Sequence, residues 1–286
     1  SPLDFALWKH DEKHLMQWDS PWGRGFPGWH IECSAMSVKY LGETFDIHTG
    51  GPDNKFPHHE CEIAQTESVT GKPFVRTWVH PGWLEIGGEK MAKSKGRMYT
   101  VPELVAEGFS GHDVRWFLLR QHYRSPLPFT LELVGEAARG RARLDNFFHY
   151  ELADRPEGPA DSAIAEAVGE ARTRFREAME DDLNTSGALA AVFDLAATVN
   201  RRKPSRADAE LVRTFLRDDV DAVFGVIGRA PEADDLDTEI EGKIAERKAA
   251  RAAKDFARAD AIRDALLARG IELLDTPQGT RWKKIR

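Results

Sequence analysis

The amino-acid sequence changes character near residue 100, and this change limits the folds that the chain can adopt. Residues 1–100 contain six of the eight tryptophans and many glycines and prolines, as in GRGFPGWH, HTGGPDN and HPGWLEIGGEK. Such punctuation is typical of loops that connect strands and helices. From about residue 101 apolar residues instead recur at three and four spacing, which favours amphipathic helices. We therefore expect an α/β region followed by an all-α region.

The second region is expected to divide into several helices. Thr100 is the expected N-cap of the first, with Glu103 three residues later, and a second helix is expected near Gly111. Apolar stripes predict a bundle of three longer helices at residues 131–150, 160–182 and 186–202. The stripe of the second of these helices consists of Ile164, Val168, Ala171, Phe175 and Met179. The acidic stretch RAPEADDLDTE is typical of a solvated linker. The tail predicts helices at 238–253 and 255–269, an end at Gly270 and two short strands.

The composition excludes some classes of protein. The chain has 286 residues, of which 41% are hydrophobic and 30% charged, and this suits one large or two to three small globular domains. It has no run of 18 apolar residues and no secretory pattern at its start, so we expect a cytoplasmic protein with no membrane partner. A net charge of −7 argues against non-specific coating of nucleic acid, although local basic stretches can still bind phosphates.

The segment FPHHECEIAQTE gathers side chains of the kinds that bind metals. A helix beginning at Pro57 puts His58, Cys61 and Glu62 on one face, about 5–6 Å apart. Imidazole and carboxylate at this spacing can hold a cation, and Cys33 could add the thiolate that Zn²⁺ favours. Alternatively, the histidine and glutamate form a solvated pair, with Cys33 a small buried hydrophobe. A disulfide between the two cysteines is the less common case in such a chain.

Two further motifs are of kinds that bind nucleotides. The loop KMAKSKG, residues 90–96, places three lysines and a serine between glycines, a composition that can hold a polyphosphate. By composition alone, a basic surface loop is the more common case. The segment HTGGPDN ends an apolar run in paired glycines followed by Asp53, an arrangement in which a carboxylate can accept hydrogen bonds from ribose hydroxyls. Alone, this second signal is weak.

Taken together and in this order, the motifs resemble those of the bacterial cysteinyl-tRNA synthetases, a family of class I aminoacyl-tRNA synthetases. The resemblance runs from residue 1 to residue 286 and rests on GFPGWHIECSAM, DIHTGGPDNKFPHHECEIAQ, EKMAKSKG, LLRQHYRSPLPFT and DDLNTSGALAAVF. It implies a cysteine–tRNA ligase, which activates cysteine with ATP and Mg²⁺, releases pyrophosphate and transfers the cysteinyl group to the 3′ end of tRNA(Cys).

The same resemblance implies a division of the chain into four parts. These parts are the second half of a Rossmann-type catalytic domain at residues 1–100, stem-contact helices at 101–130, a tRNA-binding helical bundle at 131–235, and a small α+β anticodon-recognition module at 236–286. The expected fold class is therefore α/β plus all-α.

The resemblance also implies a zinc site. Cys33, His58 and Glu62 correspond to zinc ligands of the family, and Trp29 corresponds to a residue that lies against the bound cysteine. Zinc would distinguish a thiol, which ionises and binds at about 2.3 Å, from a hydroxyl, which stays protonated. Discrimination above ~10⁴ needs about 5.5 kcal/mol, more than the ~1–3 kcal/mol that a methylene-sized difference provides.

The resemblance assigns the nucleotide-binding residues as well. The KMSKS loop of the family reads KMAKS here, with Ala92 in place of serine, and both lysines are retained. Lys90 and Lys93 would stabilise charge on the phosphates, and Lys93 is the nucleotide-binding lysine of the pair. Asp53 falls at the family's GGxD position, near the adenosine ribose.

One departure from the family concerns its His-Ile-Gly-His signature, which does not occur here. The family's fourth zinc ligand belongs to the same part of the enzyme. We therefore expect a chain that is incomplete for catalysis alone: a C-terminal part, a subunit completed by another polypeptide, or a truncated relative. Such a relative would bind tRNA or cysteine without catalysis, or join cysteine to an acceptor other than tRNA. In that case Cys61 could complete the zinc site.

The C-terminal sequence TRWKKIR combines one large ring with several cations. Trp282 is surrounded by Arg281, Lys283, Lys284 and Arg286. A stackable ring among cations can bind a single-stranded anticodon loop. A frayed basic terminus is the alternative interpretation.

Overall fold

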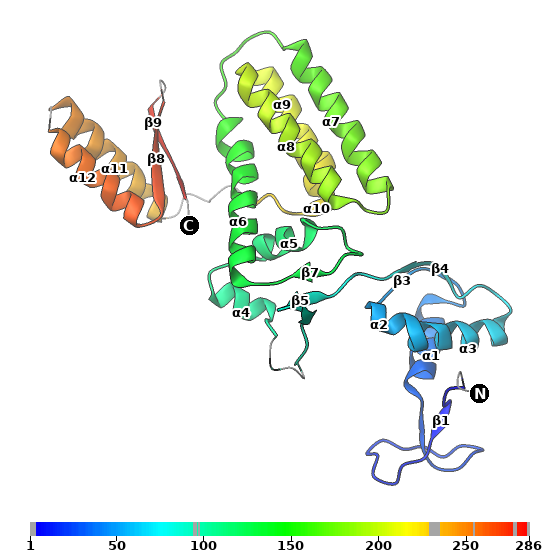
Figure 1. The fold of residues 1–286 in the computed structure, drawn as a ribbon. Helices are drawn as coiled ribbons and strands as arrows, with labels where there is room; N and C mark the ends of the chain where they lie inside the picture. The colour runs from blue at the N-terminus through cyan, green and yellow to red at the C-terminus, as the bar shows by residue number, and fades with distance from the viewer. Residues whose placement is uncertain are drawn as a thin grey trace. The chain divides into compact units, whose positions relative to one another are not determined.

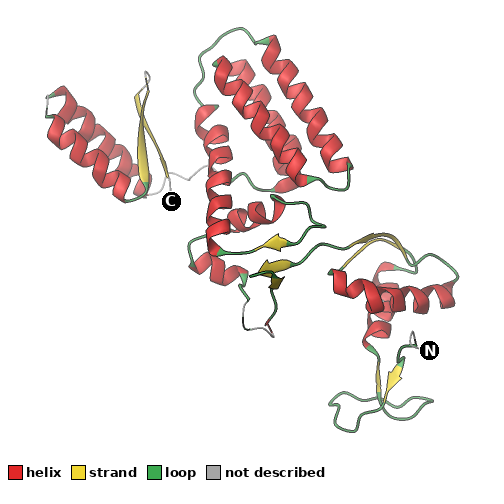
Figure 2. Cartoon of the chain, in the orientation of Figure 1, coloured by secondary structure: helices red, strands yellow, loops and turns green. Residues whose placement is uncertain are grey.

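The fold comes from a computed structural model, which describes residues 4–93, 96, 98–228, 235–253, 255–276 and 279–284. The chain forms two compact units. The first consists of Ser1–Met98 and Tyr123–Phe129, and the second of Tyr99–His122 and Thr130–Arg286. Short strands lie mainly in the first unit and long helices in the second, as Figures 1 and 2 show. The four-part division expected from the sequence stays a prediction.

The first unit is a mixed α/β structure. Its strand β3 (Phe45–Thr49) pairs in parallel with β4 (Val75–Val79), and α3 (Glu60–Thr70) lies between them in the chain. Parallel strands joined through a helix form the crossover unit of α/β folds. The helix α1 (Trp29–Leu41) packs against α3.

Smaller elements complete the first unit. The strand β5 (Leu84–Ile86) pairs with β6 (Glu89–Lys90) in antiparallel fashion and with β7 (Leu127–Pro128) in parallel. This pairing brings residues 123–129 into the unit. The other elements are β1 (Trp8–Lys9), β2 (Phe26–Pro27), α2 (Pro52–Asn54) and the π-helical segment η1 (Lys55–His59).

The local sequence explains where α3 and its preceding turn begin and end. Phe56 has extended backbone angles (φ −135°, ψ 133°), so helical conformation resumes at Pro57. Proline is tolerated at this position because the first turn of a helix has unpaired N–H groups in any case. Gly71 ends α3 in the left-handed conformation, with φ of +66°. The predicted helix start at Pro57 is confirmed.

The second unit opens with two capped helices. Thr100 caps α4 (Val101–Ala106) in a reciprocal capping box with Glu103, as the sequence predicts. The next helix, α5 (Gly111–Leu119), begins at the expected glycine and has a capping box of its own.

The three predicted bundle helices are confirmed. They are α6 (Leu131–Asn146), α7 (Ser162–Glu180) and α8 (Thr185–Arg202), and α6 continues into η3 (Phe147–Glu151). The chain then forms α9 (Arg206–Phe215), η4 (Leu216–Asp221) and α10 (Ala222–Phe224). The stripe predicted on α7 is buried except at its end: the buried residues are Ile164, Val168, Ala171 and Phe175, whereas Met179 is half-buried.

The C-terminal module has a small core of its own. It contains α11 (Asp235–Ala252), α12 (Phe256–Ala268) and the antiparallel strands β8 (Ile271–Thr276) and β9 (Gly279–Lys284). Gly270 follows α12 with φ of +79°, as predicted. The core consists of Ile240, Ile244, Leu266 and Ile271.

The predicted linker RAPEADDLDTE is partly wrong. Residues 229–234 lie outside the described residues, but the last five residues of the stretch belong to α11, which begins at Asp235. Acidic residues near a helix N-terminus interact favourably with the helix dipole, so an acidic composition there is compatible with helix.

The described part of the chain contains no helix with both the length and the apolar composition that a membrane span requires.

Candidate functional site

Three side chains of different chemistry meet in the first unit. They are Cys33 on α1, His58 on η1 and Glu62 on α3, and one ligand atom of each lies within 4.8 Å of the other two. Glu62 is fully buried, His58 is 7% exposed and Cys33 is half-buried. These are the same three residues that the sequence grouped as candidate metal ligands.

The carboxylate of Glu62 is the centre of this cluster. His48 Nε2 lies 2.7 Å from Oε2 and forms a hydrogen bond with it, whereas His58 Nε2 lies 3.0 Å from Oε1. The second contact is not aligned as a hydrogen bond, and Oε1 is buried without a hydrogen-bond partner in the described part of the chain. Burying a charged oxygen without a partner is costly, and a cation at this point would remove the cost. The residues therefore fit a bound cation.

The thiol of Cys33 is also consistent with a cation site. Burial, followed by the negative charge of Glu62, raises the pKa of Cys33 above its usual value. A divalent cation would reverse this effect, because a coordinating thiol is deprotonated. Thiolate, imidazole and carboxylate together form a ligand set that suits Zn²⁺ and other transition metals.

A second group of side chains adjoins the cluster and was not grouped by sequence reasoning. His48, His59 and Glu62 have ligand atoms within 4.8 Å of one another, and His59 Nδ1 lies 2.9 Å from His80 Nε2. Burial, then His48 and His80, lowers the pKa of His59 to about 4, so this ring is neutral at pH 7. The pairing of the strands could have indicated this group. His48 lies in β3 and His80 follows β4, and parallel strands end at the same edge of a sheet, so the two histidines lie near each other.

The cluster also has polar and aromatic neighbours from α1. His30 Nδ1 lies 2.6 Å from His58 Nδ1, a hydrogen bond that fixes the orientation of the His58 ring. Trp29 is 62% exposed, and its ring centroid is 4.6 Å from that of His58. An exposed ring beside the cluster is available to contact a ligand, and the contact of Trp29 with bound cysteine stays a prediction.

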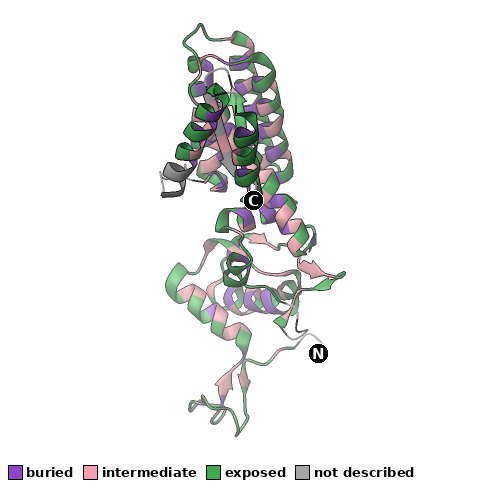
Figure 3. Cartoon of the chain, turned by 90° about the vertical axis from the view of Figure 1, so that its left-hand side faces the viewer, coloured by how far each residue is buried: buried purple, intermediate pink, exposed green. Residues whose placement is uncertain are grey.

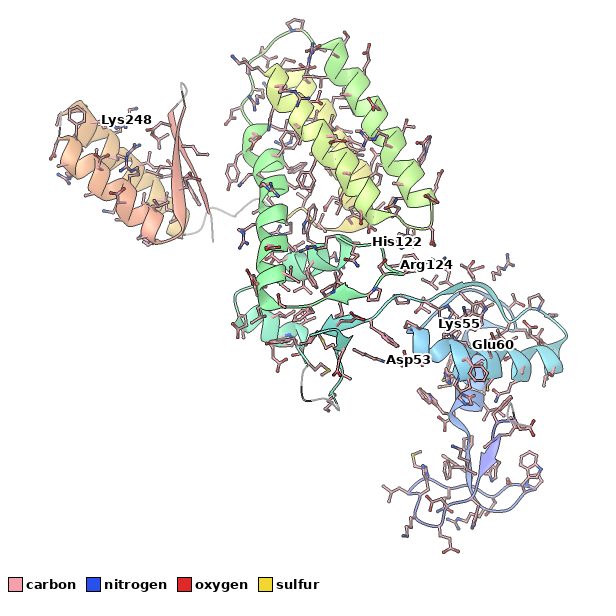
Figure 4. All side chains as sticks on the ribbon, viewed as in Figure 1. Asp53, Lys55, Glu60, His122, Arg124 and Lys248 are labelled. Atoms are coloured by element: carbon pink, nitrogen blue, oxygen red, sulfur yellow. The ribbon has the colours of Figure 1, made fainter. Side chains whose placement is uncertain are left out.

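Asp53, which Figure 4 labels on α2, forms a second polar centre in the same unit. Lys90 Nζ lies 2.6 Å from Asp53 Oδ2, and Trp83 Nε1 donates a hydrogen bond of 3.1 Å to Oδ1. The ammonium of Lys90 also lies 5.2 Å from the centroid of the Trp83 ring. Lys90 and then Trp83 lower the pKa of Asp53, so this carboxylate is charged at neutral pH. Sequence reasoning named Asp53 and Lys90 but missed Trp83.

The paired glycines of HTGGPDN have a steric role at these two centres. A Cβ atom on Gly50 would lie 2.7 Å from the ring of His59, and one on Gly51 would lie 2.6 Å from Asp53 Oδ1. Real Cβ contacts are not this close, so both positions require glycine for the observed arrangement.

Lys93 is exposed. Ser94 and Lys95 lie outside those residues, so the predicted phosphate-binding arrangement of the loop stays a prediction.

The other predicted ligand candidates differ in outcome. Cys61 is buried but belongs to neither group of ligand atoms found among the described residues, and both cysteines are free thiols. Trp282 is partly buried and packs against the core of the C-terminal module, which gives its ring a structural partner. The side chains of residues 281, 283, 284 and 286 lie outside the described part of the chain. RNA binding by this terminus stays a prediction.

Comparisons with known proteins identify the family. Residues 1–139 match the model of the class I (C) tRNA synthetase catalytic domain, and residues 174–228 match that of the DALR domain. A solved LeuRS of Agrobacterium radiobacter K84, crystallised in a ternary complex with tRNA and LeuAMS, is similar in fold, with a TM-score of 0.52 and 16% identity. That similarity covers 71% of this chain and 32% of the LeuRS chain.

Sequence similarity to curated proteins is much higher. The chain is 49% identical to the cysteine–tRNA ligase of Geobacter sulfurreducens over 306 residues and 49% identical to that of Symbiobacterium thermophilum over 292 residues. Each alignment covers 99% of this chain, and it covers 63% of the first relative and 62% of the second. The chain thus spans slightly less than two thirds of the length of these relatives. It belongs to the class I tRNA synthetases, in the family of the cysteine–tRNA ligases.

Proposed function

We propose that this chain carries the metal-binding and nucleotide-binding parts of a cysteine–tRNA ligase. The reaction joins cysteine to ATP as cysteinyl-adenylate, releases pyrophosphate, and then transfers the acyl group to the 3′ end of tRNA(Cys). The observation that carries the proposal is the meeting of Cys33, His58 and Glu62 around a buried carboxylate oxygen that lacks a hydrogen-bond partner among the described residues. A role in translation also makes a cytoplasmic location part of the proposal.

In this proposal Cys33, His58 and Glu62 hold zinc. Zinc, when bound, would supply a Lewis-acid centre that accepts the thiolate of the substrate. His48 binds Oε2 of Glu62, and His30 binds Nδ1 of His58. Glu62 Oε1 and His58 Nε2 are thereby left directed at the cluster. These contacts support a site whose ligands are fixed before the metal binds.

Such a site explains how cysteine could be separated from serine without an editing step. The two amino acids have nearly the same shape, and size alone supplies about 1–3 kcal/mol of discrimination. A soft cation binds a thiolate well and a neutral hydroxyl poorly. The exposed ring of Trp29, next to His58, would cover the bound amino acid from one side.

The nucleotide is assigned to the second polar centre. Asp53 would accept a hydrogen bond from a ribose hydroxyl of ATP, because its charged carboxylate has lone pairs beyond those used by Lys90 and Trp83. Lys90 and Lys93 would stabilise the negative charge that develops on the phosphates, together with the Mg²⁺ that accompanies ATP. We assign the surrounding α/β structure to the second half of a Rossmann-type nucleotide fold.

We assign tRNA binding to the helical parts of the chain. In this assignment residues 101–130 contact the acceptor side of the site, residues 131–235 bind the body of the tRNA, and residues 236–286 recognise the anticodon. The match of residues 174–228 to the DALR domain supports a separate helical domain here.

Cysteine-dependent exchange of pyrophosphate into ATP tests this function. The assay uses cysteine and serine as substrates and compares this chain with a form extended at its N-terminus. We expect exchange with cysteine in the extended form, and exchange with serine that is lower by at least ~10³. Absence of cysteine-dependent exchange from both forms, or equal exchange with serine, would overturn the proposal.

A further inference from the structure

The helical unit contains a groove that the site described above does not use. It lies between α5, α6 and α8 and has a volume of about 440 Å³. Its walls include Arg120, Arg143 and Phe193, and its floor is made of small residues, among them Ala137 and Gly140. A volume of this size is in the range of small-ligand sites and can hold one nucleotide unit.

The two arginines of the groove differ from most arginines of this unit. The guanidinium of Arg143 lies 5.9 Å from the centroid of the Phe193 ring, and that of Arg120 lies 6.0 Å from the centroid of Phe117. In the part of the chain that the structure describes, neither makes an ion pair with a carboxylate. A guanidinium over an aromatic face is attracted to the ring. One terminal nitrogen of Arg120 also donates a hydrogen bond of 3.3 Å to the backbone carbonyl of Leu133, and each guanidinium has further N–H donors that a ligand can use.

Several arginines elsewhere in the same unit are neutralised by nearby acids. Ion pairs join Arg172 to Asp219 at 3.0 Å, Arg174 to Asp194 at 2.9 Å, and Arg202 to Asp161 at 2.6 Å. The chain as a whole has a formal charge of −7. Two guanidinium groups at one groove, each beside an aromatic ring and neither in an ion pair within the described residues, therefore form a local site for an anion.

We propose that this groove binds one phosphate and the adjoining ribose of an RNA strand. Arg120 and Arg143 take the phosphate oxygens, since a guanidinium fork matches phosphate geometry. The ribose lies on the floor formed by Ala137 and Gly140. Glu136, the acid that lines the groove, accepts a hydrogen bond from the 2′-hydroxyl, which favours RNA over DNA.

The floor of the groove depends on the absence of a side chain at Gly140. A Cβ atom there would already lie 3.4 Å from Trp116 Nε1, and a larger side chain would extend into the groove. This inference rests on the proposed function, because a tRNA is the RNA that the function supplies. It adds a specific contact site that the family assignment does not name.

The test is binding of a tRNA(Cys) transcript, measured at several salt concentrations with the same form of the protein that is used for pyrophosphate exchange. We expect the double variant Arg120→Ala, Arg143→Ala to lose affinity by about tenfold or more. We also expect the slope of log affinity against log salt to fall by about one, because the contact with one phosphate is lost. Arg76→Ala, which removes one such charge from an exposed position on β4 outside the parts assigned to tRNA, should leave both quantities unchanged.

A second variant removes no charge. Gly140→Leu fills the floor of the groove, and leucine is more favourable than glycine within a helix, so the helix should remain stable. We expect tRNA affinity to fall by about tenfold with an unchanged melting temperature. Thermal denaturation monitored by circular dichroism checks that both variants remain folded.

The outcomes separate this inference from the proposed function. Adenylate formation does not use the groove, so pyrophosphate exchange should be the same in the wild-type protein and in both variants. Wild-type tRNA affinity and salt slope in both variants, or no tRNA binding by the wild-type protein, would overturn the groove assignment. Saturable binding of AMP that is lost in the double variant, with tRNA binding unchanged, would instead assign the groove to a free nucleotide.

Discussion

The two units of this chain bury different kinds of side chain. In the first unit, polar residues are buried around one point, and they include His58, His59 and Glu62. In the second unit, the buried residues are mainly apolar. Figure 3 colours the buried residues purple. The buried acids there, Asp113 and Asp208, mainly serve as helix caps.

The difference shows that the two units meet different physical requirements. Apolar burial stabilises a helical bundle whether or not a ligand is present. Buried polar groups stabilise a fold only when each has a partner, and Glu62 Oε1 lacks one among the described residues. Substitutions should therefore change ligand binding in the first unit and the free energy of unfolding in the second.

The largest expected effect is on metal affinity at Glu62. Removal of a residue that only hydrogen-bonds to a metal ligand typically lowers metal affinity by roughly 10–100-fold. Glu62→Gln removes a charged ligand itself, at the centre of the cluster, so zinc affinity should fall by more than this. Competition with a chromogenic chelator measures the dissociation constant. Glu60→Gln is the matched control, because Glu60 is exposed on the same helix and takes no part in the cluster. Equal zinc affinity in Glu62→Gln and the wild-type chain would contradict the metal assignment.

A large but separate effect is expected in the bundle. Phe215 is fully buried, and its ring contacts the edge of Phe175 at a centroid distance of 6.3 Å. Phe215→Ala should lower the free energy of unfolding by about 3–5 kcal/mol, because it leaves a cavity in the apolar core. Urea denaturation measures this loss, and zinc affinity should not change. A loss below about 1 kcal/mol would show that the bundle is not stabilised by apolar burial as described.

A smaller effect is expected in the C-terminal module, where the buried side chain of Arg247 is paired with the exposed carboxylate of Asp275. Arg247 is 3% exposed, and its two terminal nitrogens bind the carboxylate of Asp275 at 2.8 and 2.9 Å. Arg247→Met should lower the stability of the module by about 1.5–3 kcal/mol at pH 7, the range for hydrogen bonds to charged groups. Hydrogen exchange at the amides of β8 measures the change locally.

The same pair should make the module sensitive to acid. Arg247, followed by Thr280, lowers the pKa of Asp275 below its usual value. A carboxyl group with a lowered folded-state pKa contributes stability above its unfolded value of about 3.9, and this contribution is lost as the pH falls toward the folded value. The difference between Arg247→Met and the wild-type protein should therefore shrink between pH 5 and pH 2. A difference that stays constant over this range would contradict the pairing.

The smallest expected effect concerns a helix cap. The Ser205 hydroxyl accepts a hydrogen bond from the backbone N–H of Asp208 and caps α9. Ser205→Ala should cost about 1 kcal/mol of unfolding free energy. Ser162→Ala is the control, since that exposed serine is the first residue of α7 and the cap is formed by Asp161. Equal losses in both variants, measured by urea denaturation, would argue against the cap.

Much of the helical unit was predictable because its physics is local. The spacing of Ile164, Val168, Ala171 and Phe175 predicted α7, and the Thr100 capping box predicted the start of α4. Local signals failed in the linker, where an acidic composition was interpreted as solvated chain although helix α11 begins at Asp235.

The candidate site was predictable only in part. Helical spacing grouped His58 with Glu62, ligand chemistry and the resemblance added Cys33, and the ligand atoms of these three residues do lie together. The contact of His48 with Glu62 depends on the pairing of β3 with β4, and that of Trp83 with Asp53 joins residues 30 positions apart. Such tertiary contacts are not contained in local patterns, so sequence reasoning missed both partners.

The central claim is that Cys33, His58 and Glu62 hold a cation that recognises a thiol. The most direct measurement is the near-ultraviolet spectrum of the chain loaded with Co²⁺, whose charge-transfer band reports thiolate ligands. We predict a band that is lost in Cys33→Ser, retained in Cys61→Ser, and strengthened by added cysteine but not by serine. A band that survives in Cys33→Ser, or that responds equally to cysteine in Glu62→Gln, would contradict this account.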